Sequence, residues 1–305
     1  MTSISTVASA DILQRKPQNI AVQTNPSHDL LIIHPDVPEP GPNDCLIHVR
    51  ATGICGSDVH FWKHGHIGDM VVRGENGLGH ESAGVVIKTG KDVTRFKPGV
   101  YSAYAIRLFL LIFPLILIIT GDRVALECGI PCSKPTCHFC RTGRYNACPD
   151  IVFFSTPPYH GTLRRYHLHP EAWLHPLPDS LSFEEGSLLE PLSVALAGID
   201  RSNLRLGTPL VICGAGPIGL VTLLAAHASG AAPIVITDLD ENRLTKAKEL
   251  VPRVRTIQVE RSDDAKHVGA KIVKALGSEA RLVLECTGVE SSIHSAIYVR
   301  RYNDN

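Results

Sequence analysis

The chain has 305 residues and a balanced charge, with 30 Lys and Arg residues against 30 Asp and Glu residues. This balance gives no basic surplus for nucleic acid binding and no acidic surplus of the kind found in disordered tails. The length is sufficient for two domains, and the hydrophobic content of 44% suits a globular α/β protein. Residues 1–20 contain no apolar core of secretory length, which predicts no signal peptide and favours a cytoplasmic location.

Residues 1–185 are predicted to form a mostly-β domain. This part is rich in Gly, Pro and His, and it contains short strand-like runs such as CLIHVRA (45–51) and SAGVVIKTG (82–90). The domain also contains Cys55 in GICGSDVH, followed by His80 and Glu81 in GLGHESAG, and Glu190 in LLEPLSVA lies just beyond it. Each motif alone is weak, since a lone Cys is usually a small buried hydrophobe. Together they supply the thiolate, imidazole and carboxylate ligands typical of a catalytic zinc site with an open position.

An apolar run interrupts the domain in RFKPGVYSAYAIRLFLLIFPLILIITGDRVALECGIPC (95–132). Residues 108–119 are all apolar, with Pro114 in the middle. A transmembrane helix needs about 20 apolar residues, so a proline-split run of this length is too short. A surface loop of this composition would expose a large apolar patch on a globular protein.

A cysteine cluster follows at once. CSKPTCHFCRTGRYNAC contains Cys132, Cys137, Cys140 and Cys148 at the spacing C-x4-C-x2-C-x7-C. In a chain without an export signal, such clustering favours a metal site over disulfides. Four thiolates close a tetrahedron around zinc and leave no open position, so the predicted site is structural; Cys128 is a spare thiol close by.

From residue 186 the pattern changes to alternating strands and helices. The predicted order is a strand, a glycine-rich turn and a helix within 209–230, a strand at 232–240, a helix at 241–250 with Asp240 as its N-cap, and strands at 255–260 and 280–288. Such alternation predicts a parallel sheet covered by helices, which is a Rossmann-type domain over 186–305.

The glycine-rich turn has the pattern of a dinucleotide site. Gly214, Gly216 and Gly219 form GxGxxG, with Pro217 and Ile218 between the last two glycines. The pattern follows a strand and opens a helix, so the helix N-terminus faces the pyrophosphate. Asp238 ends the next strand about 20 residues further on, where a carboxylate accepts hydrogen bonds from the adenosine ribose and repels a 2′-phosphate. This favours NAD over NADP.

Taken in order, the motifs GICGSDVH, GHESAG, the four-cysteine lobe, EPLSVALAG and GAGPIG resemble the zinc-dependent medium-chain dehydrogenases. VHFWKHG and DIVFFSTPPYHGTLRRYH are most similar to the polyol branch of that family, close to fungal L-arabinitol dehydrogenases and to sorbitol and xylitol dehydrogenases. The resemblance covers residues 28–297 with one gap. It implies a GroES-like catalytic domain over 1–185 followed by the Rossmann domain.

The resemblance also implies roles for individual residues. Cys55, His80 and Glu81 would bind a catalytic zinc, Glu190 would ligate it or hold its water, and Ser57 and His60 would form a proton relay. Cys132, Cys137, Cys140 and Cys148 would hold the structural zinc, although the first spacing of x4 departs from the commoner x2. The implied reaction is oxidation of a polyol secondary alcohol to a ketose with NAD, in a homo-oligomer that binds neither nucleic acid nor membrane.

Two departures from the family pattern lead to further hypotheses. Joining Gly99 to Asp122 restores a continuous turn and strand, so residues 100–121 are interpreted as a foreign insertion. Val100 has a GT codon, and the apolar run suits a translated pyrimidine-rich tract, so we favour an intron read as protein. Only four of six expected Rossmann strands are present, and VRRYNDN (299–305) suggests a second intron. The alternatives are an inactive zinc-binding product of an unspliced or truncated gene, and a membrane-tethered variant.

Overall fold

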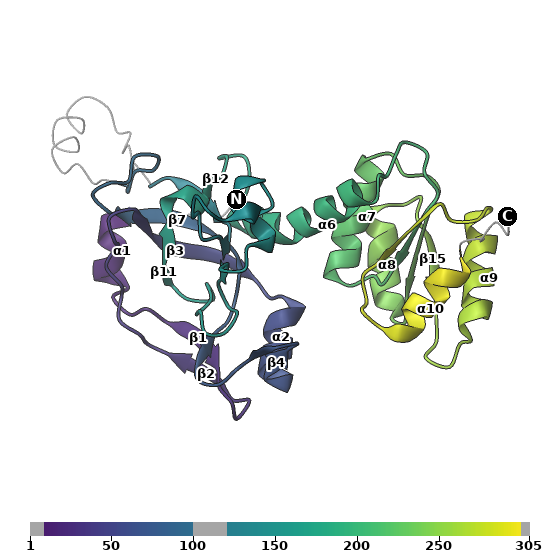
Figure 1. Cartoon of the computed structure of the whole chain (residues 1–305), viewed down its shortest axis with the longest axis horizontal. Coiled ribbons are helices and arrows are strands. Elements are labelled where there is room, and N and C mark those ends of the chain that lie inside the picture. Colours follow the sequence, from purple (N-terminus) through teal and green to yellow (C-terminus); the bar gives the residue numbers. More distant parts are fainter. Residues whose placement is uncertain (1–8, 100–120, 300–305) are drawn as a thin grey trace. The chain divides into compact units, whose positions relative to one another are not determined.

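In the computed structural model, residues 9–99 and 121–299 are described, and the chain divides into two compact units, residues 1–190 and 191–305 (Figure 1). Unit 1 contains the predicted β domain and unit 2 the predicted Rossmann domain. The division lies close to the sequence-based boundary between residues 185 and 186. Each unit is described by itself below.

A five-stranded antiparallel sheet is the centre of unit 1. Its strands run in the order β11-β3-β7-β8-β12. Their bounds are β3 (Asp44–Gly53), β7 (Glu81–Thr89), β8 (Arg123–Leu126), β11 (Tyr166–Pro170) and β12 (Leu174–Pro176). β7 has neighbours on both sides and is buried over most of its length, and its middle residues, Ala83–Ile87, are apolar.

Alternation along β3 divides its side chains between two cores. Cys45 and Ile47 pack with Val86 and Val124 in one hydrophobic cluster. Leu46 points to the opposite face, into a second cluster that includes Ile12 of helix α1 (Ser9–Arg15). This period of two is the strand signature that the sequence showed in CLIHVRA.

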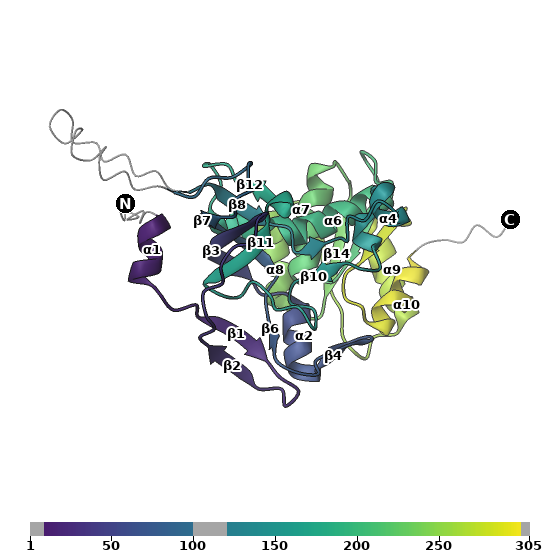
Figure 2. The same ribbon diagram turned by 60° about the vertical axis from the view of Figure 1, so that its left-hand side comes forward.

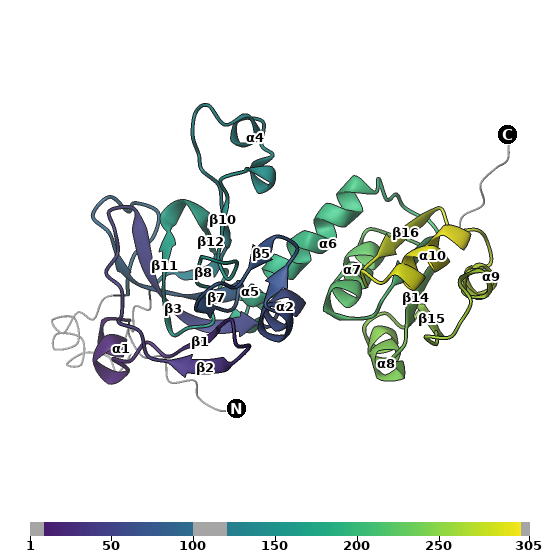
Figure 3. The same cartoon turned by 60° about the horizontal axis from the view of Figure 1, so that its bottom comes forward.

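Smaller elements surround this sheet. They are the three-stranded sheet β2-β1-β6 (Leu30–Ile33, Ala21–Thr24, Asn76–Gly77), the ribbons β4–β5 (His66–Ile67, Met70–Val71) and β9–β10 (Gly129–Ile130, Val152–Phe153), and the helices α2 (Gly56–His64), α4 (His138–Arg141), η1 (Tyr145–Ala147), η2 (Glu171–Trp173) and α5 (Phe183–Ser187). Helix α2 lies beside β4 and packs its buried Phe61 against Val72 and Leu78 (Figure 2). A lobe that carries α4 extends from the β9–β10 ribbon (Figure 3).

The predicted insertion, 100–121, lies outside the described residues except for Gly121. The residues that flank it meet in space. The backbone N–H of Lys97 donates to Oδ2 of Asp122 at 2.7 Å, and the N–H of Asp122 donates to the carbonyl of Lys97 at 3.1 Å. A Cβ placed on Gly121 would lie 2.7 Å from the backbone nitrogen of Gly99. The described residues on either side of the gap, 97–99 and 121–122, are therefore direct neighbours.

Unit 2 is a four-stranded parallel sheet in the order β15-β14-β13-β16. The strands are β13 (Leu210–Cys213), β14 (Ile234–Asp238), β15 (Arg255–Gln258) and β16 (Leu282–Glu285), and the helices are α6 (Leu189–Arg201), α7 (Pro217–Ala228), α8 (Glu241–Leu250), α9 (Ala265–Leu276) and α10 (Glu290–Tyr298). The order corresponds to strands 3-2-1-4 of a Rossmann fold. The α/β prediction for this half is confirmed, and Asp240 caps α8 by accepting a hydrogen bond from the N–H of Asn242 at 2.8 Å.

Helices cover both faces of this parallel sheet. Leu210 and Ile212 of β13 point into a core with α6, α7 and α8, whereas Val211 and Cys213 point into a core with α9 and α10. Figure 3 shows α7 and α9 on either side of the sheet. Because both faces are buried, the strands consist mainly of apolar residues, and β13 follows this rule along its whole length.

Candidate active site

Strand pairing brings together three of the predicted metal ligands. Cys55 lies just after β3, and His80 and Glu81 lie where β7 begins; the pairing of Gly53 with Glu81 joins the two strands at this point. The ligand atoms of Cys55, His80 and Glu81 lie within 4.8 Å of one another. A side chain at Gly53 would displace the Glu81 carboxylate, because a Cβ at that position would lie 2.0 Å from Oε2 of Glu81.

Asp58 fixes the two segments that carry these ligands. This aspartate is only 2% exposed. Its Oδ2 accepts from the backbone N–H of Cys55 at 3.1 Å, and its Oδ1 accepts from the N–H of Gly79 at 2.8 Å. One carboxylate thus ties the turn before α2 to the residue before His80. The sequence analysis missed Asp58, although an acidic residue at the third position of a helix is a recognisable capping signal.

Ser155 sets the orientation of the His80 ring. Its Oγ lies 2.7 Å from Nδ1 of His80, and its backbone carbonyl accepts from the side-chain amide of Asn76 at 2.8 Å. Phe153 packs against the same imidazole, with ring centroids 5.4 Å apart. Because Nδ1 is engaged by the protein, Nε2 is the atom left to act as a ligand. Sequence reasoning gave no signal for Ser155, since it is 75 residues away from His80.

The electrostatics of the cluster favour a bound cation. Burial raises the pKa of Cys55 and the pKa of Glu81, and nearby Asp58 raises both further. In the absence of a metal, these shifts favour the protonated thiol and carboxyl group, which are poor metal ligands. A bound divalent cation would favour the thiolate and the carboxylate, because its charge offsets the repulsion between them. A thiolate, an imidazole and a carboxylate are also the ligand types that suit zinc. The residues therefore fit a zinc ion.

The other predicted catalytic residues occupy different positions around this cluster. Glu190 lies outside the group whose ligand atoms are within 4.8 Å of one another. Burial raises its pKa, and the charges of His80 and Glu81 also act on it. Ser57 forms a side-chain hydrogen bond with Cys55. His60 is exposed, and its ring lies 4.5 Å from that of His64.

The four-cysteine lobe is arranged for a tetrahedral metal. All four Sγ atoms lie within 4.8 Å of one another, with 3.8 Å between Cys132 and Cys140 and 4.0 Å between Cys137 and Cys148. Four sulfur ligands at the usual zinc–sulfur bond length stand about 3.8 Å apart. Burial raises the pKa of Cys140 to about 12, and a backbone hydrogen bond from Cys132 lowers the pKa of Cys148 to about 7. Four sulfur atoms at these distances match the ligand set of a closed zinc site, so this group also fits zinc.

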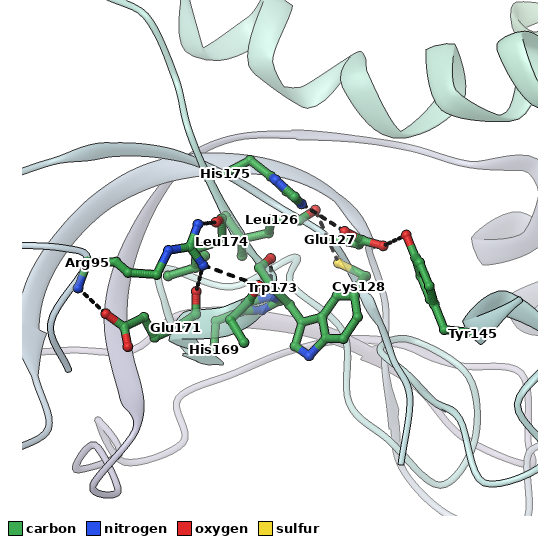
Figure 4. A network of polar contacts seen from close by, with 11 residues as sticks. Arg95, Leu126, Glu127, Cys128, Tyr145, His169, Glu171, Trp173, Leu174 and His175 are labelled. Carbon is green, nitrogen blue, oxygen red and sulfur yellow. Dashed lines mark hydrogen bonds and ion pairs between the residues drawn. The ribbon is translucent and has the colours of Figure 1, made fainter. Parts of the chain in front are cut away.

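A polar network anchors the lobe to the main sheet (Figure 4). Glu127, which follows β8, accepts from the hydroxyl of Tyr145 in the lobe at 2.7 Å, and its other oxygen lies 2.7 Å from Nε2 of His175 on β12. The hydrogen bond to Glu127 raises the pKa of Tyr145 to about 12, so the phenol remains a donor. The ring of Tyr145 also packs against Trp173 at 5.1 Å.

In unit 2 the GxGxxG turn has the geometry expected of a pyrophosphate site. Gly214 has φ +95°, which L side chains rarely adopt, and a Cβ on Gly219 would lie 1.9 Å from the Gly214 carbonyl oxygen. Gly216 is the N-cap of α7 and Pro217 its first residue, followed by Ile218. The helix N-terminus therefore opens directly at the turn.

Asp238 lies beside this turn at the end of β14. Its carboxylate accepts from the N–H groups of Ala215 at 2.7 Å and Asp240 at 2.9 Å. The guanidinium of Arg243 lies 3.8 Å from Oδ2 of Asp238. A cavity of about 530 Å³ opens here, and it is lined by Gly214, Asp238, Arg243 and Arg261 among others. Its size and lining fit the adenosine half of a dinucleotide.

These two units together define an oxidoreductase that uses a bound metal and a dinucleotide. Comparison with known families agrees: residues 41–104 and 118–179 match the alcohol dehydrogenase GroES-like domain. The chain is 50% identical to L-arabinitol 4-dehydrogenase of Talaromyces emersonii over 306 residues, covering 95% of this chain and 72% of that protein. It is 44% identical to sorbitol dehydrogenase of Gallus gallus over 284 residues, covering 93% of this chain and 73% of that one.

Solved structures show the same fold. The structure of 2R,3R-butanediol dehydrogenase from Bacillus subtilis has a TM-score of 0.72 and 29% identity, covering 91% of this chain and 74% of that one. The chain belongs to the zinc-dependent medium-chain alcohol and polyol dehydrogenase family. The predicted fold class, with a GroES-like β domain before a Rossmann domain, is confirmed, as are zinc and a nicotinamide dinucleotide as cofactors of the family.

Proposed function

We propose that the fold serves NAD-dependent oxidation of a polyol secondary alcohol to a ketose, as in L-arabinitol 4-dehydrogenase. The observation that carries this proposal is the convergence of Cys55, His80 and Glu81, held by Asp58 and Ser155. The similarity to fungal L-arabinitol 4-dehydrogenases supports the substrate class.

In the proposed reaction, Cys55, His80 and Glu81 would hold the catalytic zinc, and Glu190 would hold either the metal or a water beside it. Zinc supplies Lewis acidity that lowers the pKa of an alcohol hydroxyl, and the nicotinamide supplies a hydride acceptor. Ser57, next to Cys55, accepts the proton of the substrate hydroxyl, and His60 passes it to solvent. The half-buried Glu190 would add a polar group for a polyhydroxylated substrate.

NAD is the proposed form of the cofactor. The carboxylate of Asp238 is 9% exposed at the mouth of the adenosine cavity, where a 2′-phosphate would meet its negative charge. Arg243 and Arg261 line the same cavity, but the Arg243 guanidinium is already directed to Asp238. The pyrophosphate would contact the N–H groups at the N-terminus of α7, next to its N-cap Gly216.

The test is a dehydrogenase assay on the zinc-loaded chain, with NAD and with L-arabinitol, xylitol or sorbitol. NADH formation that is abolished in Cys55→Ser and unaffected in Cys286→Ser supports the proposal. A chain that binds two zinc ions yet reduces no NAD with any of the three polyols would instead support the inactive zinc-binding product. That result would overturn the catalytic proposal for this chain.

We also propose that residues 100–121 are not part of the functional fold, and that they derive from an unspliced intron. Support comes from the meeting of Lys97 with Asp122, and from the family match, which omits residues 105–117. Sequencing of the mature transcript across Gly99–Asp122 tests this. Abundant polysomal message that retains these codons would overturn it.

The remaining proposals concern location and assembly. No helix among the described residues is long and apolar enough to cross a bilayer, and the apolar run 108–119 lies outside them. We propose a cytoplasmic homo-oligomer that acts on a small polyol and binds no nucleic acid. Its balanced charge supports the last point.

A further inference from the structure

Three histidines gather on the surface of unit 1, at the end of helix α2. His60 and His64 are one helical turn apart, and their ring centroids lie 4.5 Å from each other at 50°. His66 comes from strand β4, and its ring lies 6.4 Å from that of His60, edge to face at 88°. All three side chains are exposed.

The backbone beneath this histidine cluster is firmly held. Gly65 ends α2 with φ +73° and donates its N–H to the carbonyl of Phe61 at 3.0 Å, which turns the chain back into β4. Phe61 is 2% exposed and packs against Val72. On the other side, Trp62 donates through Nε1 to the carbonyl of His28 at 2.9 Å. The three exposed imidazoles are therefore carried by a backbone held by hydrogen bonds and packing.

We propose that His60, His64 and His66 form a surface site for a divalent transition metal of the nickel or zinc type, which when occupied would withdraw His60 from the proposed proton relay. Two histidines at positions i and i+4 of a helix face the same way, and this is the spacing by which helices in metalloproteases hold zinc. Imidazole is a preferred ligand of Ni²⁺, Cu²⁺ and Zn²⁺. His66 adds a third ligand from a second element, which gives the site its orientation.

This site differs in kind from the two described above. In those two sites all ligand atoms lie within 4.8 Å of one another. Among the described residues, the ring nitrogens of the three histidines do not meet this distance. His60 and His64 form the pre-arranged pair, and the exposed His66 must rotate inward to complete the site. Such a site binds more weakly than a closed one, because part of the binding energy orders a side chain. The amine of Lys63 is drawn aside over the Trp62 ring, at 4.2 Å from its centroid.

The test is titration of the full chain with Ni²⁺, after the chain has been loaded with two zinc ions and freed of excess metal. Binding is monitored by calorimetry and by quenching of Trp62, which lies between His60 and His64 in the sequence. We expect one additional saturable site. His64→Ala should weaken it by about tenfold or more, and His66→Ala by a smaller factor, as expected for loss of one ligand. The matched control is His227→Ala, which removes an exposed histidine from helix α7.

Ni²⁺ affinity that is equal in the parent chain and His64→Ala would overturn the proposal, as would the absence of saturable binding. Circular dichroism and a zinc content of two per chain show whether each variant is folded, so a loss caused by unfolding is recognised. The experiment measures Ni²⁺ binding and does not require the chain to be active as a dehydrogenase. Failure of the metal proposal is therefore distinct from failure of the proposed dehydrogenase.

Discussion

Oγ of Ser155 lies 2.7 Å from Nδ1 of His80, and this contact fixes which nitrogen of the histidine faces the candidate catalytic metal. The histidine is 4% exposed and the serine 1%, so water does not replace the bond if the hydroxyl is lost. Outer hydrogen bonds of this kind orient the ring and raise its basicity as a ligand.

Ser155→Ala is therefore expected to weaken zinc at the Cys55–His80–Glu81 site by about 10- to 100-fold. The measurement is zinc release to a graded chelator, with the two sites distinguished by a Cys55→Ala reference. The four-cysteine site should keep its zinc. As a control, Ser229→Ala removes a hydroxyl that bonds within helix α7. Equal zinc retention in Ser155→Ala and the parent chain would contradict the assigned role.

The second prediction concerns the proposed role of Asp238 in the choice between NAD and NADP. Asp238→Ser removes the charge that faces the adenosine ribose and leaves Arg243 and Arg261 to attract a 2′-phosphate. We expect NADH affinity to fall by about tenfold and NADPH affinity to rise, each measured by fluorescence titration. The control is Asp240→Ser, since this exposed acid two residues away only caps α8. An unchanged ratio of NADH to NADPH affinity in Asp238→Ser would refute the role.

Local patterns were sufficient to predict the elements that carry the site. Each of these patterns depends only on residues that are close together in the sequence. They are the strand at 45–51, the strand, turn and helix of 209–230, and the helix cap at Asp240, and the structure has each of them at the predicted place. The four cysteines were predictable for the same reason, since their spacing is local.

Contacts between distant segments were not predictable in this way. Ser155 reaches His80 across 75 residues, and Glu127 joins Tyr145 to His175 across three separate elements. Neither contact leaves a periodic pattern. Asp58 is an intermediate case, because its bond to Cys55 is a local capping signal whereas its bond to Gly79 depends on the tertiary fold.

Buried histidines predict how stability depends on pH. Burial lowers the pKa of His169 from 6.5 to about 4, and burial also places the pKa of His167 well below its usual value. The unfolded chain takes up a proton at each histidine as the pH falls through 6.5, while the folded chain does not. Stability is thus full above pH 6.5 and declines toward pH 4. For His169 the difference corresponds to at most about 3 kcal/mol of unfolding free energy.

His169→Gln should make the unfolding free energy depend less steeply on pH between pH 6 and 4.5. The change in slope should correspond to about one proton fewer taken up on unfolding. Urea unfolding at several pH values, followed by tryptophan fluorescence, gives the slope. Metal loss affects parent and variant alike, so it cancels in the comparison. The exposed His34→Gln is the matched control and should keep the parent slope. If His169→Gln shows the parent slope as well, proton uptake at His169 is not part of the acid transition.

The last prediction concerns removal of residues 100–121. The N–H of Lys97 and the carboxylate of Asp122 already form the bond that would close the shortened turn, and the N–H of Val86 donates to the carbonyl of Asp122 at 2.9 Å. A chain with Gly99 joined to Asp122 should keep both zinc ions and give a higher soluble yield, because an apolar segment prone to aggregation is lost.

Zinc content, size-exclusion chromatography and thermal unfolding measure this outcome. The same deletion combined with Asp122→Ala provides the comparison, since it loses the side-chain bond to Lys97 and should unfold at a lower temperature. A deleted chain that aggregates more than the parent, or that loses the zinc of the four-cysteine lobe, would show that 100–121 supports unit 1. Full zinc content and improved solubility would show instead that the β domain is complete without the segment.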